Sequence, residues 1–182
     1  MSQDDQIILA VDENGEFKGE YIPKWVGHTG KGQRHLAITV QLINSKGELL
    51  IQRRKHRVFD DVWDMTASTH PLHNPDGTDE TVEDASWRSL EREYQISEKM
   101  PLKNYGFFDY FATYGELCEN EHCAMLVGEY NGDFKLNEEV GYGYKWMSKK
   151  EFIEDVEKNP NNYSPWTVAG AKVLKDAGFF NS

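Results

Sequence analysis

The amino-acid sequence predicts one α/β or α+β domain that covers residues 1–182, and three observations support this fold class. The chain has 182 residues, of which 38% are apolar and 13% aromatic, enough to fill one sizeable core. Short β-branched runs that end at turn residues alternate with longer segments that carry helix caps. We find no internal repeat and no linker that would divide the chain.

The first half of the chain has the pattern of paired strands. Apolar and β-branched residues fill 7–11 and 35–43, and the second run is followed by a Gly-bearing turn at 44–47. The segments 12–19 and 21–34 contain several glycines, which indicates a turn and a loop. The strands predicted in this half are 7–11, 35–43, 48–53 and 63–68.

A helix is predicted after the loop at 73–78. Residues 81–96 contain neither Gly nor Pro, and acidic side chains stand near the start of this segment. Thr78 or Asp79 is the expected N-cap. The strands predicted beyond this helix are 105–114, 121–130 and 145–147.

Two further helices are predicted near the end of the chain. Ser148 and Glu151 have the spacing of a capping box, which opens a helix that continues through residue 156. Pro165 is suited to the first position of the last helix, predicted at 166–177 after Ser164, and Gly178 follows that helix.

The charge and apolar patterns exclude several classes of protein. The net charge is −11, from 20 Lys and Arg against 31 Asp and Glu, which opposes general binding of nucleic acid. No apolar run approaches the roughly 20 residues that cross a bilayer, and the polar residues 1–6 lack the features of a signal peptide. We therefore expect a cytoplasmic protein with no membrane span, and we expect Cys118 and Cys123 to be reduced thiols.

One basic cluster stands out against the acidic background. It comprises Arg53, Arg54, Lys55, His56 and Arg57. Such a run is either a solvated strand end or a local concentration of cations that binds a small anion. The residue types alone leave both interpretations open.

Three histidines and two glutamates form a candidate metal site. His28 lies in the glycine-rich segment, His35 opens a predicted strand, and His70 precedes a proline. Glu119 and Glu121 are two positions apart, so on a strand both carboxylates point to one face. Imidazoles and carboxylates together suit Mn²⁺, Mg²⁺, Fe²⁺ or Zn²⁺.

Seven motifs in order cover the chain from about residue 24 to the last helix. They are K-x-x-x-H at 24–28, H-L-A at 35–37, R-R at 53–54, T-H-P at 69–71, R-x-x-x-x-E at 88–93, E-N-E-x-C at 119–123 and S-P-W at 164–166. With these motifs the chain resembles the type 1 isopentenyl-diphosphate isomerases. The resemblance implies a Nudix-like mixed sheet sandwiched between helices.

The resemblance also implies roles for individual residues. The divalent-metal ligands would be His28, His35, His70, Glu119 and Glu121, and Glu93 would hold Mg²⁺ against the substrate. The diphosphate would be bound by Lys24 and Arg54, with Lys55 or Arg57 as a further cation. The catalytic residues would be Glu121 and the residue at position 68, with Tyr110 and Trp166 as aromatic residues of the substrate pocket. The implied cofactors are Mg²⁺ and a second divalent ion, Mn²⁺ or Zn²⁺, in the His/Glu site, and the implied partner is a small-molecule diphosphate. We expect a monomer or weak homodimer.

The chemistry of this isomerisation explains why such residues are needed. One carbon is protonated and another loses a proton, with a tertiary carbocation between the two steps. An indole face stabilises the cation, and water must be excluded.

The chain departs from the family at the second acid–base group, where Ser68 replaces a cysteine. A serine hydroxyl is a far weaker acid than a thiol, whose pKa is about 8.5. Isomerase activity that is slow or altered is therefore the first hypothesis.

The alternatives are a Nudix-type hydrolase of a prenyl or nucleoside diphosphate and a non-catalytic diphosphate binder. The Nudix hydrolase box fits at Glu80, Arg88, Glu93 and Ile96, but Ser89, Arg92 and Gln95 stand where Glu, Glu and Gly are expected. Because hydrolases use that Glu cluster to collect metal ions, a standard hydrolase fits less well than an isomerase.

Overall fold

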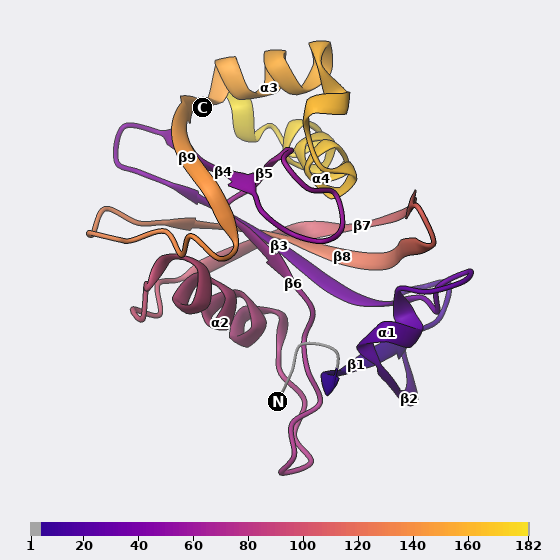
Figure 1. The fold of residues 1–182 in the computed structure, drawn as a ribbon. Coiled ribbons are helices and arrows are strands. Elements are labelled where there is room, and N and C mark those ends of the chain that lie inside the picture. Colours follow the sequence, from indigo (N-terminus) through magenta and orange to yellow (C-terminus); the bar gives the residue numbers. More distant parts are fainter. Residues whose placement is uncertain (1–4, 182) are drawn as a thin grey trace.

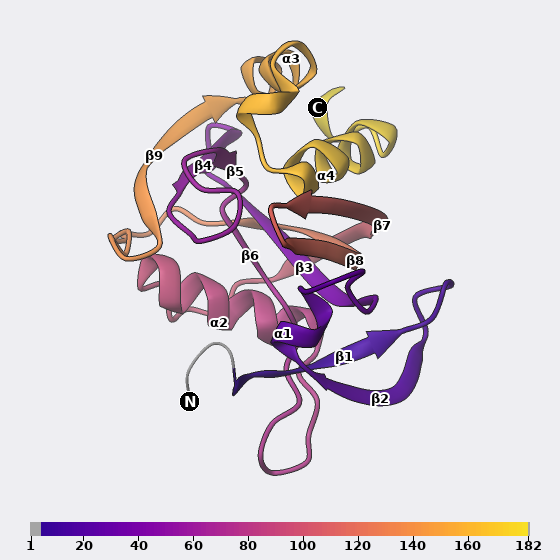
Figure 2. The ribbon, with the colours of Figure 1, turned by 45° about the vertical axis from the view of Figure 1, so that its right-hand side comes forward.

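In a computed structural model that describes residues 5–181, the chain forms a curled mixed sheet with helices on both faces (Figures 1 and 2). The strands are β1 (Ile7–Val11), β2 (Phe17–Pro23), β3 (His35–Ile43), β4 (Glu48–Arg54), β5 (Trp63–Asp64), β6 (Ala67–Thr69), β7 (Leu102–Tyr114), β8 (Leu117–Glu129) and β9 (Gly141–Ser148). The helices are α1 (Lys24–Gly27), α2 (Val82–Tyr94), α3 (Lys149–Lys158) and α4 (Pro165–Asp176). The short 3₁₀ turns are η2 (Pro160–Asn162) and η3 (Phe179–Asn181).

Strand β3 is the centre of the sheet. It pairs antiparallel with β1, β4 and β6 and parallel with β8 along its whole length. Its predominance of apolar residues is explained by burial on both faces. The predicted α/β or α+β fold class, with helices on both sides of a mixed sheet, is confirmed.

Two apolar clusters lie on opposite faces of this sheet. On one face, Leu90 and Tyr94 of α2 pack over Val40 and Leu126. On the other, Phe152 of α3 belongs to a cluster that also contains residues of β4, β8 and α4. The alternation of side chains along β4 and β8 sends neighbouring residues into different clusters.

The structure corrects several predicted boundaries. Strand β2 and helix α1 lie in segments predicted as a turn and a loop, and β2 carries no apolar alternation because most of it is exposed. The strand predicted at 63–68 is two strands, since β5 pairs with β4 and β6 with β3. Strands β7, β8 and β9 begin at residues 102, 117 and 141, earlier than predicted.

The helix caps are partly as predicted. Ser148 and Glu151 form the expected capping box of α3, and Ser164 caps α4 with Pro165 at its first position. For α2 the prediction of Thr78 or Asp79 was wrong, because Thr81 is the N-cap and closes a capping box with Asp84.

Both cysteines are free, as expected. Among the helices of residues 5–181, none combines the length and the apolar character needed to cross a membrane.

Candidate metal centre and active site

The five candidate ligands come together at one end of the β3–β8 pair. Each offers one ligand atom within 4.8 Å of the others, and all five residues are buried: His28, His35, His70, Glu119 and Glu121. The parallel register places His35 opposite Glu121. His70 follows β6, the antiparallel neighbour of β3, and His28 follows α1. Sheet pairing therefore brings residues from four separate segments into one cluster.

A glycine allows α1 to approach this cluster closely. A Cβ atom at Gly27 would lie only 2.8 Å from Nδ1 of His35, so a larger residue would collide with the ring. The absence of a side chain at Gly27 lets His28 reach the same space as His35. Their ring centroids are 4.8 Å apart.

Backbone carbonyls orient two of the imidazoles. Nδ1 of His28 lies 2.7 Å from the carbonyl oxygen of Lys24, and Nδ1 of His35 lies 2.7 Å from that of Gln33. Because a carbonyl only accepts, each Nδ1 carries a hydrogen, and each Nε2 is the ring atom that faces the cluster. This is the arrangement of a histidine that binds a metal.

The contacts inside the cluster leave buried polar atoms without hydrogen bonds. Nε2 of His28 is 2.9 Å from Oε2 of Glu119, and Nε2 of His70 is 2.8 Å from Oε1 of Glu121. Within the described residues, however, Oε2 of Glu119 and Nε2 of His35 have no partner in hydrogen-bond geometry. Such atoms cost folding free energy unless something satisfies them. Three imidazole nitrogens and two carboxylates are a donor set that fits a divalent ion.

The electrostatics favour the protonation state that binds metal at His70 and Glu121 but not at His28. Burial lowers the pKa of His70 well below its usual value, which keeps that ring neutral. Burial alone would raise the pKa of Glu121, but His35 and His28 outweigh it and hold the pKa below its usual value. The pKa of His28 is raised, because Glu119 outweighs the effect of burial. A metal ion would therefore compete with a proton mainly at His28.

A cavity borders the cluster and contains most of the other predicted residues. Lys24, Arg54 and Arg57 line it as cations. Lys55 does not point there: its Nζ donates to the carbonyl oxygen of Glu138 at 2.8 Å and lies over the ring of Tyr142. The curvature of the loop after β4 decides which cation faces the cavity.

Two ionisable cavity residues, Arg92 and His56, were not predicted as site residues. Arg92 of α2 lines the cavity, although its only sequence signal was a mismatch to the hydrolase box. His56 also lines it, and burial together with Arg54 and Lys24 lowers the pKa of His56 to about 4. The Nδ1 atom of His56 accepts from the backbone N–H of Val58 at 3.3 Å.

Glu121 has a second neighbour in the cavity. The hydroxyl of Tyr110 donates to Oε2 of Glu121 at 2.5 Å, because the two residues are paired between β7 and β8. Burial, and after it the charge of Glu121, raises the pKa of Tyr110 well above its usual value, so the hydroxyl keeps its hydrogen. Ser68 also lines the cavity, and its Oγ is 3.1 Å from Oγ1 of Thr39.

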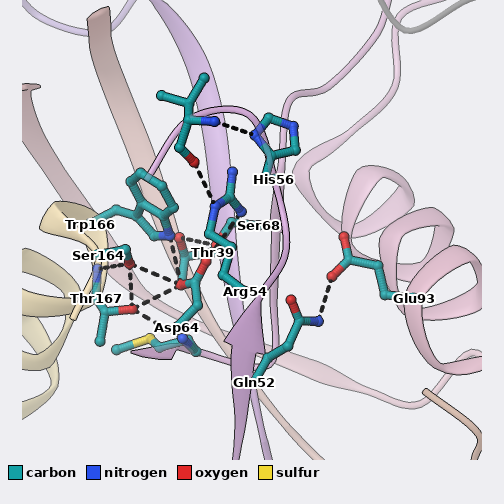
Figure 3. A network of polar contacts seen from close by, with 12 residues as sticks. Thr39, Gln52, Arg54, His56, Asp64, Ser68, Glu93, Ser164, Trp166 and Thr167 are labelled. Atoms are coloured by element: carbon teal, nitrogen blue, oxygen red, sulfur yellow. Dashed lines mark hydrogen bonds and ion pairs between the residues drawn. The ribbon is translucent and has the colours of Figure 1, made fainter. Parts of the chain in front are cut away.

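Trp166 is held by a buried carboxylate at the start of α4. Its Nε1 donates to Oδ1 of Asp64 at 2.7 Å, and the hydroxyls of Ser164 and Thr167 donate to the same oxygen at 3.0 and 2.9 Å (Figure 3). The guanidinium of Arg54 lies 4.8 Å from the indole centroid. Asp64 thus connects the aromatic residue to one of the cations.

Glu93 lies apart from the five-residue cluster. Its Oε2 accepts from Nε2 of Gln52 at 2.9 Å (Figure 3). Its Oε1 is paired with the guanidinium of Arg92. The structure therefore brings the five metal-site candidates together but leaves Glu93 in a separate set of contacts.

Comparison with known proteins gives a family and a set of relatives. Residues 33–167 match the model of the NUDIX domain. The chain is 29% identical over 153 residues to an isopentenyl-diphosphate Delta-isomerase of Shigella boydii (serotype 4, strain Sb227), covering 82% of this chain and 81% of the relative. An isopentenyl-diphosphate Delta-isomerase of Escherichia coli (strain K12 / DH10B) is 28% identical with the same coverage.

Solved structures share the fold at lower identity. DR0079 from Deinococcus radiodurans has a TM-score of 0.63 at 15% identity and covers 85% of this chain and 90% of its own. A MutT protein from Methanosarcina mazei Go1 has a TM-score of 0.61 at 18% identity, with coverage of 80% and 95%. At these identities the likeness concerns the fold alone.

Proposed function

The chain belongs to the NUDIX family, and on this premise we propose that it is a metal-dependent isomerase of isopentenyl diphosphate. The product would be dimethylallyl diphosphate. Relatives named isopentenyl-diphosphate Delta-isomerase support this reaction. The observation that carries the proposal is the position of Glu121, which belongs to the His/Glu cluster and also faces the cavity beside Tyr110.

The chain's own residues are suited to the separate parts of the reaction. Lys24, Arg54 and Arg57 provide positive charge for the diphosphate. Glu121 exchanges a proton with the five-carbon chain, and the Tyr110 hydroxyl holds the carboxylate in position through its hydrogen bond. The indole of Trp166 offers its ring to the tertiary carbocation.

The two proton transfers leave the hydrocarbon with the same atoms and the same oxidation level. A proton is added to the terminal methylene carbon, and another proton leaves the carbon next to the diphosphate-bearing carbon. A divalent ion bound by the five residues would supply positive charge beside Glu121 and lower the pKa of its carboxyl. Ser68 stands where the second acid–base group is needed, and its weak acidity is expected to limit the rate.

The hydrolase alternative is weakened by the side chains of α2. Ser89 stands where hydrolases have a glutamate, and its hydroxyl is fully buried and donates to the carbonyl of Ser86 at 2.8 Å. Gln95 has a φ of 57°, the left-handed conformation that the glycine of the box would adopt. The helix therefore keeps the backbone shape of the box but lacks two of the carboxylates that would collect metal ions, at Ser89 and Arg92.

Conversion of isopentenyl diphosphate to dimethylallyl diphosphate, measured with Mg²⁺ and Mn²⁺ present, tests the proposal. We expect slow turnover by the wild type and a rate at least about tenfold higher for Ser68→Cys, because a thiol is the stronger acid. Glu121→Gln should lower the rate by about 10²–10⁴-fold, since the amide cannot exchange the proton.

The controls separate the three hypotheses. Ser68→Ala keeps the cavity but removes the hydroxyl, and an unchanged rate would show that Ser68 takes no part. No turnover by the wild type together with robust turnover by Ser68→Cys would mean that the native protein does not catalyse this isomerisation. Phosphate release from a panel of prenyl and nucleoside diphosphates would favour hydrolysis, and thermal stabilisation by substrate without any product would favour a binder.

A further inference from the structure

Each oxygen of the Glu93 carboxylate is already in contact with a protein side chain. Nε2 of Gln52 donates to one oxygen at 2.9 Å, and Arg92 is paired with the other. Gln52 is itself fixed, because the same nitrogen lies 3.2 Å from the Tyr94 hydroxyl and 3.4 Å from the carbonyl of Thr66. Glu93 is only 5% exposed, and each of its two oxygens already has a protein partner. This arrangement does not fit the sequence-based expectation that Glu93 holds Mg²⁺ against the substrate.

Arg92 connects Glu93 to the cavity. Its guanidinium is paired with Glu93, and the same side chain lines the cavity together with Lys24 and Arg54. Its Nε is buried and has no hydrogen-bond partner within residues 5–181. A guanidinium has five donors in a planar fork, which suits it to a carboxylate on one side and a phosphate on the other.

We propose that Arg92 takes the place of Mg²⁺ between Glu93 and the substrate, so that the diphosphate is bound by arginine and lysine side chains and only the His/Glu cluster takes a divalent ion. This inference rests on the diphosphate site of the proposed function. The paired Glu93 keeps Arg92 in place, and the remaining donors of Arg92 face the diphosphate. Glu93 is then a positioning residue for Arg92.

The proposal is tested by binding of inorganic diphosphate, measured by calorimetry on the full chain loaded with one equivalent of Mn²⁺. For the wild type, adding Mg²⁺ should change the affinity for free diphosphate less than about threefold once Mg²⁺–diphosphate complexes in solution are accounted for. Arg92→Gln should weaken binding about ten- to a hundredfold without Mg²⁺, the effect of losing a hydrogen bond to a charged group. The same variant should recover affinity when Mg²⁺ is added, because Glu93 is then free to hold the ion.

A count of bound ions gives a second readout. Titration with Mn²⁺ in the presence of diphosphate, followed by electron paramagnetic resonance, should find one ion per wild-type chain and two per Arg92→Gln chain. The double variant Arg92→Gln/Glu93→Gln should return to one ion and lose the recovery. Lys99→Gln removes an exposed charge that lies over the ring of Trp87 and does not line the cavity, and it should behave as the wild type.

A second Mn²⁺ ion on the wild type, or an unchanged diphosphate affinity in Arg92→Gln, would overturn the inference. Failure of free diphosphate to bind the wild type without Mg²⁺ would also overturn it. None of these results depends on turnover. Magnesium-independent binding without isomerase activity would support the role of Arg92 and count against the proposed reaction, whereas isomerase activity with two bound ions would do the reverse.

Discussion

Lys24 is a residue at which stability and ligand binding oppose each other. Burial, with a contribution from Arg92, lowers its pKa from 10.5 to about 8. The folded state therefore binds fewer protons than the unfolded state between pH 8 and 10.5, so this group makes the free energy of unfolding rise with pH across that window. Below pH 8 the charged side chain is a constant cost to folding.

Replacement of this side chain should therefore stabilise the protein and weaken binding. We expect Lys24→Met to raise the free energy of unfolding at pH 7 by about 1–3 kcal/mol and to flatten its rise at alkaline pH. The affinity for inorganic diphosphate should fall about tenfold or more, because one cation of the cavity is lost. Urea unfolding at pH 7 and pH 9.5 and calorimetry measure the two effects.

The matched control is Lys18→Met, which removes an exposed lysine of β2 and should leave both quantities nearly unchanged. A pH dependence of Lys24→Met identical to that of the wild type would show that Lys24 does not titrate in this window.

At the residue scale, the residue types predicted the chemistry of the site better than they predicted which side chains point into it. Glu119 and Glu121 lie on one face because strand alternation fixes that geometry wherever a strand forms. Lys55 and Arg57 are alternatives in sequence, and only the path of the loop after β4 brings Arg57 to the cavity. The contact between Gln52 and Glu93 could not be predicted, because Gln52 lies on β4 and reaches Glu93 on α2 only in the complete fold.

At the element scale, Asp64 attaches the start of α4 to the sheet. Three donors from α4 and its cap converge on one buried oxygen, and Nη1 of Arg54 lies 3.4 Å from the other. We expect Asp64→Ala to lower the free energy of unfolding by about 3–5 kcal/mol, because it leaves several buried polar groups without a partner. Asp64→Asn, which keeps an accepting oxygen, should cost less. Urea unfolding measures the loss, and near-ultraviolet circular dichroism reports the environment of Trp166.

Ser148→Ala provides the comparison for this prediction. This substitution removes the N-cap of α3, whose side-chain partner Glu151 is exposed. It should lower the free energy of unfolding by about 0.5–2 kcal/mol. A loss in Asp64→Ala no larger than this would show that Asp64 contributes only as an ordinary cap partner.

A helix or strand could be predicted where residues close together in the sequence determine it, and not where its pairing with a distant strand does. The capping box at Ser148 was predicted because both partners lie within four residues. Strand β2 was missed because it is an exposed edge strand, which within residues 5–181 pairs with β1 alone and needs no apolar pattern. The break between β5 and β6 depends on which distant strand each one pairs with, which no local pattern contains.

At the scale of the whole molecule, the sheet register is what assembles the site. The pairing of His35 with Glu121 joins residues that are far apart in the chain, and the pairing of β7 with β8 adds Tyr110 beside Glu121. Residue chemistry alone suggested a shared metal site, and the ordered motifs of the isomerase family made that suggestion specific. The physical cause, a parallel register between β3 and β8, is a property of the complete fold.

A divalent ion in this cluster should stabilise the molecule as a whole, because its ligands come from α1, β3, β6 and β8 or the residues next to them. Mn²⁺ at a hundredfold excess over its dissociation constant should add about 2.7 kcal/mol to the free energy of unfolding. Glu119→Gln should remove more than half of this gain, whereas Glu116→Gln, an exposed glutamate in the turn before β8, should retain it. The gain should shrink as the pH falls, since the raised pKa of His28 lets a proton displace the ion.

Thermal unfolding with and without Mn²⁺ measures this gain in stability, and hydrogen exchange shows which strands it protects. Protection should rise together in β3, β6 and β8, and a rise confined to α1 would mean that the ion binds without coupling these strands.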